Sequence, residues 1–358
     1  MRIKKALFLG TLCTAVSGMS LFAQAGVSYA KSAEKTTEAA SSEEAESEEE
    51  TSEEVTYPIT IEHAFGETVI ESKPERIATI GWENQDTPLA LGVAPVGVSA
   101  ANYGMVTDNN LHPWTDEAFA DLGVEKPVVF DDVDGLDFEQ ISDCNPDVIL
   151  AAYSGMTQED YDTLSQIAPV IPYKEKAWQT SWREQTIENA EGMGMKPEGE
   201  KKVKEVEDLI AEKLEEYPQL EGIPTAFCWI SADDFSTFYV YLPTDPRAAY
   251  LLDLGLTLTE SVQKLAGETD DFNITVSREN ADQLDDIQLM VVYGDEDLLK
   301  SLQEDKLMSQ IPAIKNGAVA LVDSTSALAG ASTPSILSIP YEIDEYLQLL
   351  SDAAENIK

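Results

Sequence analysis

Aromatic side chains stand at the ends of several apolar segments that the sequence predicts to be strands. Trp82, Tyr153 and Tyr293 each end or closely follow such a segment. In open α/β sheets a ligand lies beyond the carboxyl ends of the strands, so we expect these rings to face one cleft. Rigid rings with polar edges suit a bulky ligand that has flat apolar faces. The predicted ligand-binding residues are Trp82, Asn84, Tyr103, Trp114, Tyr153, Trp178, Trp229, Arg247 and Tyr293.

Other kinds of chemistry find little support in the sequence. A protein site for zinc or manganese needs several His and carboxylate ligands at close range, and the chain has only His63 and His112. A nucleophile elbow, a zinc-protease helix motif and a phosphate loop are all absent from the sequence. We therefore expect neither an enzyme nor a direct metal site, and no intrinsic cofactor.

The order of predicted elements indicates an α/β protein with two lobes. Strands alternate with helices in both halves, which favours two Rossmann-like lobes with parallel sheets. In the second half, residues 276–283 are predicted to form one of the helices. Between the halves, apolar residues at helical spacing predict one long helix over residues 198–217, and Pro218 ends it. The predicted domains are an N-terminal lobe (57–180), a helical region with the inter-lobe helix (181–220) and a C-terminal lobe (221–358), with the ligand cleft between the lobes.

The N-terminal segment indicates export. Basic residues precede an apolar run that ends in small residues, which predicts a signal peptide over residues 1–30 with cleavage after Ala25 or Ala30. Cys13 leaves a lipid anchor as an alternative, although Leu12 stands where a lipoprotein signal has a small residue. We expect a location at the outer face of the cytoplasmic membrane, in the cell envelope or in the periplasm.

An acidic segment follows the signal peptide. Residues 31–56 hold ten Glu and no aromatic residue, so they are predicted to be a disordered linker. The remaining 302 residues keep 57 of the 67 acidic and 18 of the 23 basic side chains, a net charge near −39. Nucleic acid is therefore excluded as a partner, because its binding depends on neutralising phosphates with Lys and Arg.

Several short strings, in the right order, resemble a known family. They are Ile61-Glu62-His63-Ala64-Phe65-Gly66 with Lys73-Pro74-Glu75-Arg76-Ile77, Gly81-Trp82-Glu83-Asn84-Gln85-Asp86 with Leu89-Ala90-Leu91-Gly92-Val93-Ala94-Pro95-Val96-Gly97-Val98, Asn145-Pro146-Asp147-Val148-Ile149-Leu150, and Tyr153-Ser154-Gly155-Met156-Thr157 with Leu164-Ser165-Gln166-Ile167-Ala168-Pro169. Together they resemble the siderophore and cobalamin class of ABC-importer binding proteins, whose lobes are joined by a rigid helix. The last two strings together resemble the ferric-siderophore branch in particular.

This resemblance implies a role and its partners. The chain would capture an iron(III)-siderophore complex as a monomer and hand it to the permease of an ABC importer and, through the permease, to its ATPase. In the family, Glu residues in equivalent contexts of the two lobes dock onto Arg pockets of the permease, which implies that role for Glu139 and Glu279.

The charge of the cleft bears on the kind of siderophore. A tris-catecholate complex carries a large negative charge and favours several Arg or Lys side chains in its cleft. The predicted strand ends offer none, and Arg247 is the best single candidate. A hydroxamate or mixed-type complex is therefore favoured. Haem and cobalamin remain alternatives, followed by an exported enzyme or a structural surface protein.

Overall fold

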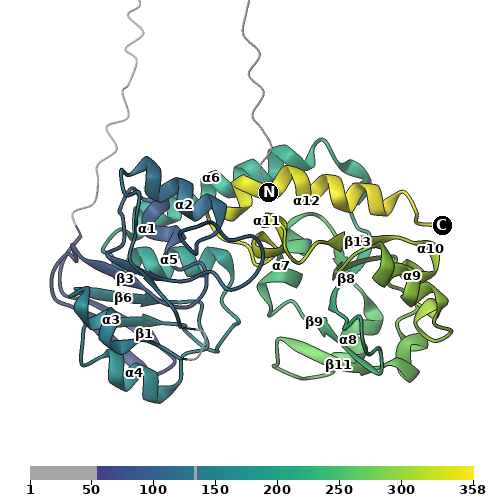
Figure 1. Cartoon of the computed structure of the whole chain (residues 1–358), viewed down its shortest axis with the longest axis horizontal. Coiled ribbons are helices and arrows are strands. Elements are labelled where there is room, and N and C mark those ends of the chain that lie inside the picture. The colour runs from purple at the N-terminus through teal and green to yellow at the C-terminus, as the bar shows by residue number, and fades with distance from the viewer. Residues whose placement is uncertain (1–54, 133–134) are drawn as a thin grey trace, which may run out of the picture. The chain divides into compact units, whose positions relative to one another are not determined.

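A computed structural model of the chain describes residues 55–132 and 135–358. The predicted signal peptide and nearly all of the predicted acidic linker lie outside the described residues. The described residues belong to one compact unit, and Figure 1 shows two α/β lobes within it.

The N-terminal lobe is built on a five-stranded parallel sheet. A hairpin of β1 (Ile59–His63) and β2 (Gly66–Ile70) precedes the sheet, whose strand order is β5-β4-β3-β6-β7. Because parallel neighbours need a crossover, a helix stands between each pair of consecutive strands. The elements are β3 (Ile77–Thr79), α1 (Asp86–Ala90), β4 (Gly97–Ser99), α2 (Pro113–Asp121), β5 (Val129–Phe130), α3 (Phe138–Asp143), β6 (Val148–Ala151), α4 (Gln158–Leu164) and β7 (Val170–Pro172).

The C-terminal lobe holds a mixed sheet of order β11-β9-β8-β12-β13, with the short β10 paired to β8. Its strands are β8 (Pro224–Trp229), β9 (Thr237–Tyr241), β10 (Thr257–Leu258), β11 (Asn273–Ser277), β12 (Leu289–Tyr293) and β13 (Val319–Val322). Its helices are α7 (Pro246–Asp253), α8 (Glu260–Ala266), α9 (Glu296–Glu304), α10 (Pro312–Asn316), α11 (Ala327–Ala331) and α12 (Ser338–Ala354), with 3₁₀ turns η2 (Arg278–Gln283) and η3 (Met308–Gln310).

The expectation of an all-parallel sheet in this lobe is wrong. β8 pairs with β9, and β9 with β11, in antiparallel register. The connection from Trp229 to Thr237 is too short for a crossover, so β9 must return beside β8 in the opposite direction. The helix predicted over residues 276–283 is also corrected, because Val276 pairs with Phe238 at the end of β11 and only the 3₁₀ turn η2 follows.

Two helices join the lobes. α5 (Trp182–Gly192) and α6 (Lys196–Leu214) lie where the helical region was predicted, and the 3₁₀ turn η1 (Pro218–Leu220) follows α6. With 19 residues, α6 is about 28 Å long. Its buried side chains Val203, Val206 and Ile210 share a core with residues of the C-terminal lobe, and Lys213 pairs with Asp344 of α12. Figure 1 shows α6 and α12 along the same side of the molecule.

Candidate ligand-binding cleft

β3 lies at the centre of the N-terminal sheet, and the loops that follow β3 and its two neighbours lie close together. β4 lies on one side of β3 and β6 on the other, so the loops that leave the carboxyl ends of these strands meet at a topological switch point. These loops carry Trp82, Tyr103 and Tyr153. The switch point therefore positions the three rings that the sequence placed after strands.

The loop after β3 lies directly against the loop after β6. Gly81 has φ +78°, and a Cβ there would meet the carbonyl oxygen of Tyr153 at 2.7 Å, so only glycine permits this approach. The Trp82 N–H donates to the same carbonyl at 3.2 Å. The positions of Trp82 and Tyr153 are thus fixed relative to each other by backbone contact.

Asn84 ties these two loops together from behind. Its side chain is fully buried, and its Nδ2 donates to the carbonyls of Ile80 (2.7 Å) and Tyr153 (2.9 Å). Its Oδ1 accepts from the Tyr153 N–H (3.1 Å) and from Asn189 of α5 (3.0 Å), while Gln185 of α5 donates to the Trp82 carbonyl (2.8 Å). Asn84 was predicted to touch the ligand. The structure instead places it beneath the rings, as a residue that positions them.

Three rings pack together at the carboxyl edge of the N-terminal sheet. The ring centroids of Trp82 and Trp178 are 5.5 Å apart, and those of Tyr153 and Trp178 are 5.3 Å apart in an edge-to-face arrangement. Trp178 has φ +61°, and a Cβ on Gly155 would come within 2.6 Å of its ring. The absence of a side chain at Gly155 therefore lets the Trp178 ring come close to the backbone there.

A second group of rings packs together in the C-terminal lobe and meets a ring of the N-terminal lobe. Tyr293, at the end of β12, packs on Phe227 (5.1 Å), which packs on Tyr241 (5.7 Å). Tyr103, from the N-terminal lobe, meets Tyr293 edge to face at 5.3 Å. The Tyr103–Tyr293 contact thus joins the aromatic surfaces of the two lobes.

Arg247 is the cation of this second group. Its guanidinium lies 3.9 Å from the Tyr241 ring centroid. Asp245, which is fully buried, binds it bidentately, with Nη2–Oδ2 at 2.6 Å and Nε–Oδ1 at 2.8 Å. Burial by itself would lower the pKa of Arg247, but the hydrogen bonds and the charge of Asp245 outweigh it, and the pKa lies well above its usual value.

The tyrosines of the cleft are neutral phenols. Burial raises the pKa of Tyr103 to about 12, with the neighbouring Tyr241 adding to the rise and Arg247 opposing it. Burial likewise raises the pKa values of Tyr153, Tyr241 and Tyr293. These phenols therefore offer hydrogen-bond donors and aromatic faces rather than negative charge.

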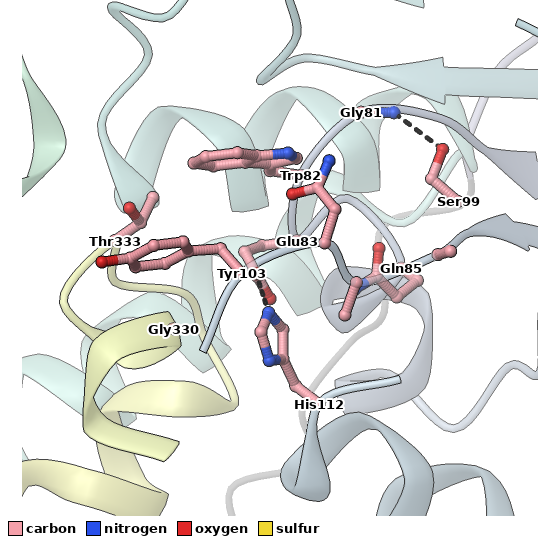
Figure 2. A pocket seen from close by; sticks show the side chains of 12 residues that line it. Gly81, Trp82, Glu83, Gln85, Ser99, Tyr103, His112, Gly330 and Thr333 are labelled. Carbon is pink, nitrogen blue, oxygen red and sulfur yellow. Dashed lines mark hydrogen bonds and ion pairs between the residues drawn. The ribbon is translucent and has the colours of Figure 1, made fainter. Parts of the chain in front are cut away.

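Two adjoining cavities lie at the carboxyl edge of the N-terminal sheet. One, of about 340 Å³, is lined by Trp82, Trp178 and Met156 among others, which is within the range of small-ligand sites. Figure 2 shows the other, where Trp82, Tyr103 and Thr333 group together and His112 lies below them, joined to Glu83. Gly330 and Thr333 come from the C-terminal lobe, so this second cavity belongs to both lobes.

A buried polar cluster supports the floor of the cleft. His112 Nε2 lies 3.2 Å from Glu83 Oε1, and both side chains are buried. Burial lowers the pKa of His112, but Glu83 outweighs it and the net shift is upward. Behind them Asp86 accepts hydrogen bonds from Trp114 Nε1 (2.9 Å) and from Ser335 of the C-terminal lobe, and its burial raises its own pKa.

The predicted ligand-binding residues fall into two sets. The structure brings six of them together in the two aromatic groups, and three of these, Trp82, Tyr103 and Trp178, line the cavities. Tyr153, Tyr293 and Arg247 belong to the same groups but line neither cavity, and both tyrosines are buried. The other three differ. Asn84 and Trp114 are buried in hydrogen-bonded positions behind the rings, and Trp229 is 41% exposed beside Tyr239, outside the two cavities described above.

Sequence reasoning missed Tyr241 and Asp245. Tyr241 ends the alternating strand β9, and Asp245 is the N-cap of α7, where its Oδ1 accepts from the Arg247 N–H at 2.9 Å. An Asp-Pro-Arg string that opens a helix is the one sequence signal that could have identified the Asp245–Arg247 pair.

Both predicted docking residues are exposed. Glu139 lies in the first turn of α3, and Glu279 lies in η2, where Ser277 Oγ donates to its carboxylate at 2.7 Å. Within the described part of the chain, no helix is long and apolar enough to cross a bilayer. The same residues bring no three His, Cys, Asp or Glu side chains together in a metal-binding arrangement.

Comparisons with known proteins agree on one family. Residues 77–325 match the profile of the periplasmic binding protein family. The chain is similar to the crystal structure of PiaA from Streptococcus pneumoniae TIGR4 in complex with ferrichrome, with 48% identity, a TM-score of 0.81, and coverage of 84% of this chain and 100% of PiaA. It is also similar to the petrobactin-binding protein YclQ of Bacillus subtilis (strain 168), with 24% identity and coverage of 81% of this chain and 88% of YclQ.

Proposed function

This chain belongs to the periplasmic binding protein family, and from that premise we propose that it captures a ferric siderophore, of hydroxamate or mixed type, for an ABC importer. Its family and its relatives are binding proteins of transporters rather than enzymes. The ligand occupies the cleft between the Trp82–Tyr153–Trp178 group and the Tyr241–Tyr293–Arg247 group.

The observation that carries this proposal is the composition of the cleft. Aromatic faces from both lobes meet at Tyr103 and Tyr293, and they supply rigid apolar area together with phenol donors. The one arginine of this cluster, Arg247, is compensated by Asp245, so this set of residues carries little net positive charge. Such a site suits a compact ferric complex of low charge better than a trianionic tris-catecholate. The ferrichrome complex of the similar PiaA supports the same class of ligand.

Haem and cobalamin are the alternatives within this fold. A haem would need an axial Tyr, His or Met ligand. Tyr153 and Tyr293 are buried phenols with raised pKa values, and His112 is engaged by Glu83 and by the Met105 carbonyl (3.1 Å). These engagements favour a ligand that brings its iron already fully chelated.

Delivery follows from the importer role. We propose that the protein acts as a monomer outside the cytoplasmic membrane and that Glu139 and Glu279, one on each lobe, contact the permease that works with the importer ATPase. We further propose that the mature chain begins after Ala25 or Ala30. N-terminal sequencing of the exported protein checks this start, and a lipid-modified Cys13 would contradict it.

A fluorescence titration tests the proposed ligand. Trp82 and Trp178 line the 340 Å³ cavity, so emission should be quenched when a ferric trihydroxamate binds. Trp82→Ala should weaken binding by about 1–3 kcal/mol, because a stacked ring is lost. Tyr341→Ala, an exposed ring of α12 that is 42% accessible, is the control and should bind as the unmodified protein does. Unchanged emission with every ferric siderophore tried would refute the proposal.

A further inference from the structure

We propose that Asp245 sets the charge selectivity of the cleft by neutralising Arg247, so that the protein accepts uncharged ferric complexes and rejects anionic ones. This inference rests on the proposed function and concerns which class of ferric siderophore the cleft takes. Asp245 would not touch the ligand, and it would act through the arginine beside it.

The geometry of the pair carries the inference. Both carboxylate oxygens of Asp245 are used on Arg247, at 2.6 Å to Nη2 and 2.8 Å to Nε, and Oδ1 also accepts from the Arg247 N–H. The Asp245 side chain has no exposed surface, whereas that of Arg247 is 13% exposed. The carboxylate thus lies behind the guanidinium, and the arginine is the member of the pair that solvent, and therefore a ligand, can reach.

The aromatic neighbours of Arg247 are uncharged. Besides Asp245, the phenols of Tyr103, Tyr153, Tyr241 and Tyr293 interact with Arg247. All four are neutral at physiological pH, because a phenol has a pKa of about 10 and burial raises it further. An arginine remains protonated in proteins, so the charge of the group is that of one Arg and one Asp. The Asp245–Arg247 pair and these four phenols together therefore carry no net charge, in a chain whose formal charge is −44.

Removal of the carboxylate would leave the guanidinium in place. Stacking on the Tyr241 ring at 3.9 Å and the contact of Nη1 with the Tyr241 hydroxyl at 3.3 Å both hold Arg247 without Asp245. Unit charges near a protein surface attract strongly enough at contact distances to change affinity on the order of tenfold or more per charge. An uncompensated Arg247 should therefore attract a trianionic complex that the unmodified protein rejects.

Asp245→Asn is the direct test. Asparagine is nearly isosteric and is as good an N-cap as aspartate, so α7 keeps its first turn. Asp245→Ser, which also caps helices, is a second variant without the charge. Asp295→Asn is the matched control, because Asp295 caps α9 of the same lobe by accepting from the Leu298 N–H at 3.0 Å and does not touch Arg247.

The measurement is the dissociation constant of a neutral ferric trihydroxamate and of a trianionic ferric tris-catecholate, each at low and high NaCl. Asp245→Asn should gain about tenfold or more in affinity for the trianion, with the gain reduced at high salt, and should change affinity for the neutral complex about threefold or less. Asp295→Asn should match the unmodified protein.

The affinities for the two ligands decide whether Asp245 sets the charge selectivity. If neither variant at position 245 gains affinity for the trianion, or if both ligands change in parallel, Asp245 only orients the arginine and the inference is overturned. If the unmodified protein binds no ferric siderophore at all, the proposed function fails instead. Binding of the neutral complex by the unmodified protein distinguishes the two failures, because only failure of the proposed function abolishes it.

Discussion

Asn84→Ala tests whether the buried hydrogen bonds of Asn84 fix the positions of the Trp82 and Tyr153 loops. The substitution removes an amide that makes two donor bonds and at least two acceptor bonds, all of them buried. The Tyr153 N–H and the Asn189 amide lose their partner. At about 1 kcal/mol net for each hydrogen bond, more where a buried group is left unpaired, the free energy of unfolding should fall by about 3–5 kcal/mol.

The loss of stability alone would not show a positioning role, so the variant needs a control of equal severity. Ile141→Ala serves because Ile141 is fully buried in the core of the N-terminal lobe, on α3, and lines neither cavity described above. Truncation of a buried isoleucine costs about 2–5 kcal/mol, which matches the expected loss at Asn84.

Denaturant unfolding measures stability, and a fluorescence titration under native conditions measures ligand affinity. Asn84→Ala should weaken ferric-ligand binding about tenfold or more, because the Trp82 and Tyr153 loops lose their common anchor, whereas Ile141→Ala should bind almost normally. Near-ultraviolet circular dichroism should also change only in Asn84→Ala, since it reports the packing of Trp82 and Trp178. Equal affinities in the two variants would refute the positioning role.

Two further predictions concern pH and delivery. Burial, with repulsion from nearby carboxylates, raises the pKa of Glu188 to about 8. The unfolded chain releases this proton near pH 4.5, so between the two pH values the folded state binds one proton more. The free energy of unfolding should therefore fall as pH rises from about 4.5 to about 8. Glu188→Gln should remove this slope and raise stability at pH 8 by on the order of 1–3 kcal/mol, and an unaltered slope in denaturant titrations would contradict the assignment. The double change Glu139→Ala with Glu279→Ala should abolish siderophore uptake by cells and leave ligand affinity intact, because two separated anchors set orientation on the permease. Glu159→Ala with Glu296→Ala, which alters first-turn glutamates elsewhere on the two lobes, should leave uptake unchanged, and uptake that survives the first pair would disprove docking at those residues.

Much of the framework was predictable because local signals and tertiary structure agree there. Buried runs such as 148–151 and 289–293 read as strands, and each lies within a predicted segment. The positions of Trp82, Tyr153 and Tyr293 followed from the rule that loops after parallel strands share one edge. For these three residues, knowing where the preceding strand ends was enough to predict which edge of the sheet the side chain occupies.

The parts that failed depend on partners distant in the sequence. Residues 276–283 favour a helix start, but pairing of Val276 with Phe238 holds them in a strand. Trp114 looked available to a ligand, yet its indole N–H meets Asp86, 28 residues away, behind the cleft. Tyr241 belongs to the cleft only because Arg247 of the following helix lies over its ring. The periodicity of apolar residues does not predict contacts between side chains that are distant in the sequence.

The central claim is that the cleft binds one ferric siderophore of low charge, and native mass spectrometry of the exported protein tests it most directly. The protein is purified from its native medium, and the mass of the bound species is read together with its visible spectrum. We expect one iron-loaded siderophore per chain, with the absorption of a ferric hydroxamate or mixed complex. A bound haem or cobalamin, or a protein that stays ligand-free when a panel of ferric siderophores is added, would contradict it.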